Sequence, residues 1–115
     1  MSDDKVSEQR LSEKEFYDRF AKIIHFVDEV GEMADGVETL IQNDNLTLEF
    51  ANGSKIIISR QTPVRQIWVA AKSGGFHYDF HAQSGVWKNE KGGAELMAEL
   101  EQLAKLQAGV TLTLR

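Results

Sequence analysis

The sequence predicts an α+β fold in which two helices pack on one face of an antiparallel sheet. Three observations support this class: a helical apolar period near the N-terminus, another near the C-terminus, and five or six short β segments between them. Connections this short join neighbouring strands that run antiparallel. Two amphipathic helices can cover one face of such a sheet, which gives a two-layer sandwich. The 115 residues suffice for one domain.

The first helix is predicted to begin after Ser12, which can form a capping box with Glu15 inside a hydrophobic staple. Apolar residues then recur at steps of four and three, the pattern of one buried stripe: Phe16, Phe20, Ile23, Val27 and Val30. Gly31 is expected to weaken the last turn by about 1 kcal/mol relative to alanine, and Gly36 can end the helix. We expect residues 1–11 to form a flexible extension before a single domain over 12–115.

Consecutive strands are predicted for the middle of the chain. Turn residues separate five segments, with a sixth short strand around Trp87: 37–42, 46–50, 55–59, 66–72 and 76–81. Asn52-Gly53 is a hairpin signal, and Pro63 separates the third strand from the fourth. The three consecutive isoleucines of segment 55–59 are typical of a central strand.

The second helix is predicted over 94–108. Its apolar stripe consists of Leu96, Leu100, Leu103 and either Leu106 or Gln107. Gly109 occupies the position of a left-handed C-terminal cap. Segment 110–114 is either a final strand or a tail that covers the core.

The composition argues against several classes of function. The chain has 18 acidic and 13 basic residues, and a net charge of -5 disfavours nucleic acids and anionic membranes as partners. Without cysteine it has no disulfides, thiolate zinc sites or cysteine-ligated clusters. The N-terminal residues lack the patterns of signal and transit peptides, so we expect a cytoplasmic protein. Nucleophile, zinc-hydrolase and phosphate-loop motifs are also missing from the sequence, so we do not expect an enzyme.

Charge is distributed unevenly along the chain. Between Ile23 and Ser54 there is no Lys or Arg, while seven acidic residues occur: Asp28, Glu29, Glu32, Asp35, Glu38, Asp44 and Glu49. Asp28, Glu32 and Asp35 are spaced to share one side of the first helix, with His25 one turn earlier. Negative charge is unfavourable near a helix C-terminus. These carboxylates either form a solvated face, or they bind hard cations or a basic protein partner.

Two further sets of side chains on the predicted sheet each allow two interpretations. His77, Asp79 and His81 share one side of a strand, where they either ligate a metal or are the ordinary polar alternation of a half-buried strand. Trp68 lies out of phase with its apolar neighbours Ile67 and Val69. It therefore either points outward as a partner-binding residue or fills the core.

The run from Asn52 to Trp68, NGSKIIISRQTPVRQIW, strongly resembles the central strands of the frataxin family, in particular its bacterial CyaY branch. Segments 73–79 and 107–109 also match, and the resemblance covers about residues 15–115. It implies an antiparallel sheet with both helices on one face. It also implies a non-enzymatic role in iron–sulfur cluster assembly, with weak iron binding and docking on the cysteine desulfurase and its scaffold protein. We expect a monomer in the absence of metal.

The resemblance also implies the residues of the site. The acidic ridge of the family matches five carboxylates as iron ligands: Asp28, Glu29, Glu32, Asp35 and Glu38. It implies partner binding by six residues: Asp28, Glu29, Glu32, Gln61, Gln66 and Trp68. His25 and His77 are candidate secondary metal ligands. Met33 stands where an acid is common in the family, so we expect a reduced iron capacity.

Oxygen-rich sites of this kind suit ferric iron, bind ferrous iron weakly and accept other hard di- or trivalent cations. Two alternatives stay open beside an iron-responsive regulator of cluster assembly. One is an iron-oxidising or iron-storing protein, and the other is an acidic interaction domain that acts without metal.

Overall fold

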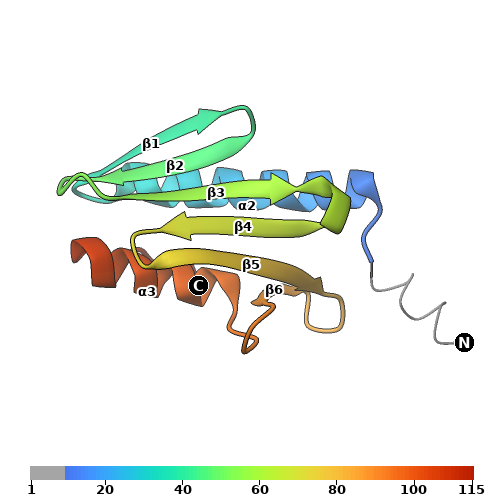
Figure 1. The fold of residues 1–115 in the computed structure, drawn as a ribbon. Helices are drawn as coiled ribbons and strands as arrows, with labels where there is room; N and C mark the ends of the chain where they lie inside the picture. Colours follow the sequence, from blue (N-terminus) through green and yellow to red (C-terminus); the bar gives the residue numbers. More distant parts are fainter. Residues whose placement is uncertain (1–9) are drawn as a thin grey trace, which may run out of the picture.

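A computed structural model of the chain describes residues 10–115, whose elements follow the order helix, six strands, helix (Figure 1). The strands form one antiparallel sheet in chain order, and the predicted fold class is confirmed. The elements are α2 (Glu13–Met33), β1 (Val37–Gln42), β2 (Asn45–Phe50), β3 (Lys55–Gln61), η1 (Thr62–Val64), β4 (Gln66–Ala71), β5 (Gly74–His81), β6 (Val86–Asn89) and α3 (Leu96–Ala108). Within residues 10–115, neither helix combines the length and the apolar character that crossing a membrane requires.

Both helices cover the same face of the sheet, α2 behind β1 to β3 and α3 beside β5 and β6 (Figure 1). The opposite face has no such cover within residues 10–115, and we call it the open face. The three isoleucines of β3 show the difference: Ile56 and Ile58 are fully buried, whereas Ile57 is 37% exposed. The run therefore does not form a strand buried on both sides, because only one face of this sheet is covered.

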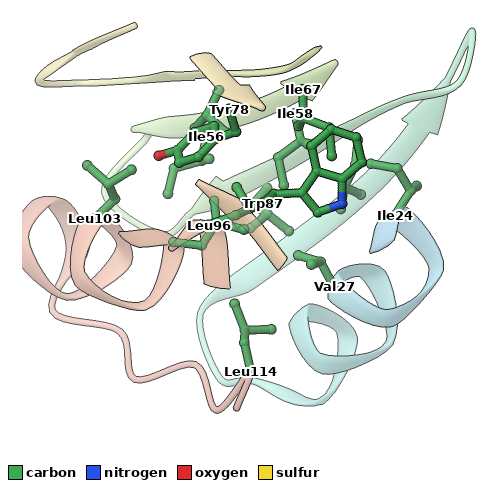
Figure 2. Close-up of a cluster of buried hydrophobic side chains, with 14 of the residues drawn as sticks. Ile24, Val27, Ile56, Ile58, Ile67, Tyr78, Trp87, Leu96, Leu103 and Leu114 are labelled. Atoms are coloured by element: carbon green, nitrogen blue, oxygen red, sulfur yellow. The ribbon is translucent and has the colours of Figure 1, made fainter. Parts of the chain in front are cut away.

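One hydrophobic cluster joins the covered face to the two helices (Figure 2). Trp87 lies near the centre of this cluster and is only 4% exposed. The strictly alternating β5 contributes Tyr78, whose hydroxyl donates a 2.6 Å hydrogen bond to Glu99 of α3. The side-chain amide of Asn89 donates to the same carboxylate over 2.9 Å. These bonds fix α3 to the sheet.

The predicted capping box opens α2. The Glu15 N–H donates to Ser12 Oγ, and the Ser12 N–H donates back to the Glu15 carboxylate. The buried side of the helix differs from the predicted stripe at two positions. Ile24 and Gly31 are buried, whereas the predicted Ile23 and Val30 are half-buried. Residues 1–9 of the predicted extension lie outside the described residues, and Leu11 is already part of the core.

Gly31 has a structural role that differs from the predicted one. A Cβ at this position would lie 2.8 Å from Thr39 Cγ2 and 3.1 Å from Leu48 Cδ2. The missing side chain therefore lets α2 approach β1 and β2 closely, which a helix propensity cannot reveal. The helix ends at Met33 with an extended cap residue, Ala34.

The C-terminal segment is a tail and not a strand. Leu112 and Leu114 are each 4% exposed and belong to the core, and Figure 2 shows Leu114 between the two helices in this view. The Leu114 N–H donates a 2.7 Å hydrogen bond to Glu101, and Arg115 forms a 2.8 Å ion pair with the same carboxylate. Two residues were alternatives for the end of the apolar stripe of α3. Leu106 is 74% exposed and so lies off the buried side, whereas Gln107 is half-buried.

Candidate functional site

The acidic side of α2 lies beside the edge strand β1. Ala21 and His25 line a groove together with Ile41 of β1 and Asp44 of the following turn. Asp28 and Glu32 continue the same side of the helix at steps of three and four residues. Asp28 is half-buried and Glu32 is exposed, so both carboxylates reach solvent along β1.

Glu29 and Asp35 do not lie on the side of α2 that carries Asp28 and Glu32. Glu29 is exposed on α2 next to Asp28. Asp35 lies beyond the end of α2, in the turn before β1, and so does not continue the helical spacing with Asp28 and Glu32 as predicted. The reason is local: Ala34 adopts an extended conformation and Gly36 has a φ of +77°, which turns the chain toward the sheet.

Glu38 lies on the open face, because its neighbour Thr39 faces α2. Its register partner is Glu49 of β2. The five predicted carboxylates thus fall on both faces of the β1 edge. We call Asp28, Glu29, Glu32 and Asp35 the acidic strip.

The donor set of the acidic strip consists of carboxylate oxygens, which are the ligands that hard cations prefer. Within residues 10–115, no three His, Asp or Glu side chains are close enough together to enclose a metal ion. A cation at the strip would therefore be held by one or two carboxylates and retain most of its water. Such sites are weak and discriminate poorly between metals.

A second group of predicted residues comes together on the open face. Trp68 lies there because Ile67 and Val69 are buried against the helices, and its ring stacks on that of His77 with centroids 4.2 Å apart. The indole N–H donates a 2.9 Å hydrogen bond to Gln66 Oε1. Gln66 Nε2 donates to Glu90, and Glu90 also pairs with His77 over 3.0 Å. We call Gln66, Trp68, His77 and Glu90 the tryptophan cluster.

Glu90 was not predicted as a site residue. It lies after β6, and only the pairing of strands brings it beside His77. The hydrogen bond from Gln66 and the nearby imidazole hold the pKa of Glu90 below its ordinary value. Gln61 is the register partner of Gln66, so the two predicted glutamines are adjacent at the end of the cluster.

The three polar side chains of β5 share the open face, as predicted, but each one has a different partner. His77 pairs with Glu90, Asp79 accepts a hydrogen bond from Gln66, and His81 contacts Ser84 over 2.8 Å. They do not converge on a common point within the described chain. Their arrangement is that of polar side chains on the uncovered face of a sheet.

Comparisons with known proteins agree with this architecture. The family model of the frataxin-like domain matches residues 9–110. The chain is 40% identical over 110 residues to the iron–sulfur cluster assembly protein CyaY of Cupriavidus metallidurans, covering 91% of this chain and 97% of that protein. It is 38% identical over 100 residues to the CyaY protein of Paraburkholderia phymatum, covering 86% and 93%.

A solved frataxin structure from Psychromonas ingrahamii superposes with a TM-score of 0.83 at 29% sequence identity. The superposition covers 91% of this chain and 99% of the Psychromonas ingrahamii chain. Family match, sequence identity and three-dimensional similarity thus extend over the same domain. The chain belongs to the frataxin-like family.

Proposed function

We propose that this protein is an iron-responsive regulator of iron–sulfur cluster assembly that docks on the cysteine desulfurase and its scaffold protein and tunes their activity. The observation that carries the proposal is the run of seven acidic residues without a single Lys or Arg between Ile23 and Ser54, five of which the fold places along α2, the following turn and β1. Of the other two, Asp44 pairs with Arg60, and Glu49 lies in β2. The names of the CyaY relatives support the process in which it acts.

Iron binding by the acidic strip follows from its chemistry. Asp28 and Glu32 are one helical turn apart, so their Cβ atoms lie roughly 5–6 Å from each other. That spacing lets both carboxylates share one hydrated cation, with Asp35 and Glu38 adding negative potential nearby. Weak binding is useful in a sensor, because occupancy then changes with the concentration of available iron.

Docking on the desulfurase relies on the same charges. A negative strip without counter-charges attracts a basic partner surface at long range, and salt weakens that attraction. The tryptophan cluster provides a second contact on the open face, where an aromatic ring stands among hydrogen-bonding side chains. Aromatic residues in such positions contribute disproportionately to protein interfaces. We assign this face to the scaffold protein.

The test is an amide NMR titration of the labelled protein with purified cysteine desulfurase at low and moderate salt. We expect shifts or broadening centred on residues 28–38 that diminish as salt is added. The variant Asp28→Lys with Glu32→Lys should weaken both desulfurase and iron binding by at least about tenfold. The matched control, Glu13→Lys with Asp18→Lys, changes the charge equally at the other end of α2 and should bind normally. No perturbation at either salt concentration would refute desulfurase docking.

Titration with ferrous iron under anaerobic conditions separates the two alternatives. Residue-specific effects at the acidic strip, lost in the doubly reversed variant, are expected for the regulator. Effects equal to those of sodium chloride at the same ionic strength would instead indicate an acidic interaction domain without a metal role. Oxygen is then admitted as the electron acceptor, and oxidation of ferrous iron faster than in buffer alone would indicate an iron-oxidising protein.

A further inference from the structure

The two edges of the sheet are protected to different degrees. At one edge, β6 has only four residues, the Asn89 N–H donates a 2.7 Å hydrogen bond to Ala94 O, and Lys88 forms a bridge with Glu95. At the other edge, β1 has six residues and pairs only with β2 among the strands of the described chain. An uncovered edge of this length is unusual, because its free backbone groups invite pairing with another strand.

The hydrogen-bond pattern identifies the free groups of β1. The Ala51 N–H donates a 3.0 Å bond to Gly36 O, so Gly36 directs its carbonyl toward β2. In an antiparallel ladder the bonded residues alternate, which directs Glu38 and Leu40 toward β2 as well. Val37, Thr39 and Ile41 therefore point their N–H and C=O groups outward from the sheet.

The sequence of β1, VETLIQ, has few of the usual devices against edge pairing, and Glu38 is its one charged residue. It contains no Lys, Arg or Pro. Four of its six residues are β-branched or aliphatic, and Leu40 and Ile41 are 57% and 40% exposed. This strand is therefore suited to accept a further strand.

The charges around the edge determine which segment can pair with it. Asp28 and Glu32 line the helix side of β1, and Glu38 lines the open side. An added strand would place its alternate side chains near these two sets of carboxylates. A second copy of this chain would bring the same carboxylates together, which like-charge repulsion opposes. Lysine or arginine side chains would instead be paired on both faces.

We propose that β1 binds an extended, Lys- or Arg-rich segment of a partner protein as a seventh strand of the sheet. The inference rests on the proposed docking through the acidic strip and specifies its geometry. Backbone hydrogen bonds to Val37, Thr39 and Ile41 supply affinity, and the carboxylates select for positive charge, as in other cases of strand addition.

The experiment uses amide hydrogen exchange of the labelled chain with an eight-residue peptide of two Lys-Lys-Val-Val repeats, which places lysines on both faces of an added strand. Without peptide, the Thr39 and Ile41 amides should exchange fast, while those of Glu38 and Leu40 are protected by β2. Saturating peptide should slow the exchange of Thr39 and Ile41 by at least about tenfold. A control peptide with N-methylated central residues keeps its charge and should give no protection.

A pair of variants tests the same geometry with the purified desulfurase. Ile41→Pro removes one outward N–H without removing a β1–β2 hydrogen bond, and proline is tolerated in such edge positions. We expect it to weaken binding by about tenfold or more, whereas Ile41→Thr, which keeps the N–H, binds almost normally. Unchanged amide signals of α3 in both variants establish that the fold is intact.

Three results would overturn the proposal. Peptide shifts at Asp28 and Glu32 with unchanged exchange of Thr39 and Ile41 would mean charge attraction without strand addition, and would leave the proposed function standing. Absence of both peptide and desulfurase binding would refute strand addition and docking together. Protection of Thr39 and Ile41 that grows with protein concentration alone would identify a second copy as the occupant.

Discussion

The two tryptophans occupy opposite environments. Trp87 is enclosed on the helix side of the sheet, with its ring centroid 5.8 Å from that of Phe16 and 5.3 Å from that of Phe80. Trp68 lies on the open face, where it is half-buried and its ring stacks on that of His77. The first side chain therefore contributes to the core, and the second is available to a partner.

Alanine substitutions should separate these roles. We expect Trp87→Ala to lower the free energy of unfolding by about 3–5 kcal/mol, because a large cavity is left in the core. Trp68→Ala should cost less than about 1 kcal/mol and weaken binding to the scaffold protein. Urea denaturation measures the first effect and calorimetric titration the second. Equal destabilisation by both substitutions would contradict the assignment.

Gly31 gives a prediction opposite to that of helix propensity. Replacing a glycine within a helix with alanine ordinarily stabilises the helix by up to about 1 kcal/mol. Here the added methyl would meet Thr39 Cγ2 at 2.8 Å, so Gly31→Ala should instead destabilise the fold by about 1–2 kcal/mol. Thr39→Ser removes that methyl and should restore much of the loss in the double variant. The coupling between the two substitutions is measured in a double-mutant cycle by urea denaturation. If they show no coupling, the contact between positions 31 and 39 does not limit how closely α2 packs on the sheet.

At the scale of whole elements, the charge at the end of α2 opposes helix stability. The last turn contains no basic residue, and Glu29 and Glu32 lie near the negative end of the helix dipole. Negative charge at this end lowers the stability of the helix, but it gives the surface the charge that would bind a cation or a basic partner.

Neutralising these charges should therefore stabilise the free protein. We expect Asp28→Asn with Glu32→Gln to raise the free energy of unfolding by about 0.5–1 kcal/mol, while reducing iron and desulfurase binding. Thermal unfolding at low salt measures the gain, which should shrink at high salt. A loss of stability would mean that these carboxylates make favourable contacts within the fold.

Elements were predictable from sequence to the extent that their signals are local. The capping box, the hairpin turn at Asn52-Gly53 and the αL cap at Gly109 each depend on a few adjacent residues, and all three segments have the predicted form. Contacts between elements were not predictable in this way. Glu90 belongs to the tryptophan cluster because strand pairing brings it beside Gln66 and His77. Glu38 is separated from the carboxylates of α2 because its side chain lies on the opposite face of the sheet.

At the scale of the whole molecule, the tail that follows α3 shares one core with the residues that begin α2. Its anchor is Glu101, whose carboxylate accepts the Leu114 N–H and pairs with Arg115. The hydrogen bond from Leu114, followed by the contacts of Arg115, lowers the pKa of Glu101 below its ordinary value of 4.5. Because the folded pKa is the lower one, this contribution to stability is present above pH 4.5 and is lost as pH falls through the folded pKa.

Acidification should therefore release the tail, and Glu101→Gln should remove that part of the pH dependence. We expect the free energy of unfolding, measured by urea denaturation between about pH 3 and 7, to fall less steeply at acid pH in this variant. Superimposable profiles for wild type and Glu101→Gln would exclude this anchor as a source of acid sensitivity.

The order of strands in the sheet also has a kinetic consequence. Every strand pairs with its neighbour along the chain, so the sheet itself forms from local hairpins without the closure of long loops. Chains with this kind of topology fold faster than those whose strands pair at long range. During synthesis, α2 and β1 to β3 can associate first, whereas β4 to β6 must wait for α3 and the tail to cover their apolar side. Residues 96–115, which follow the sheet in the chain, thus complete the core that the first residues of the domain began.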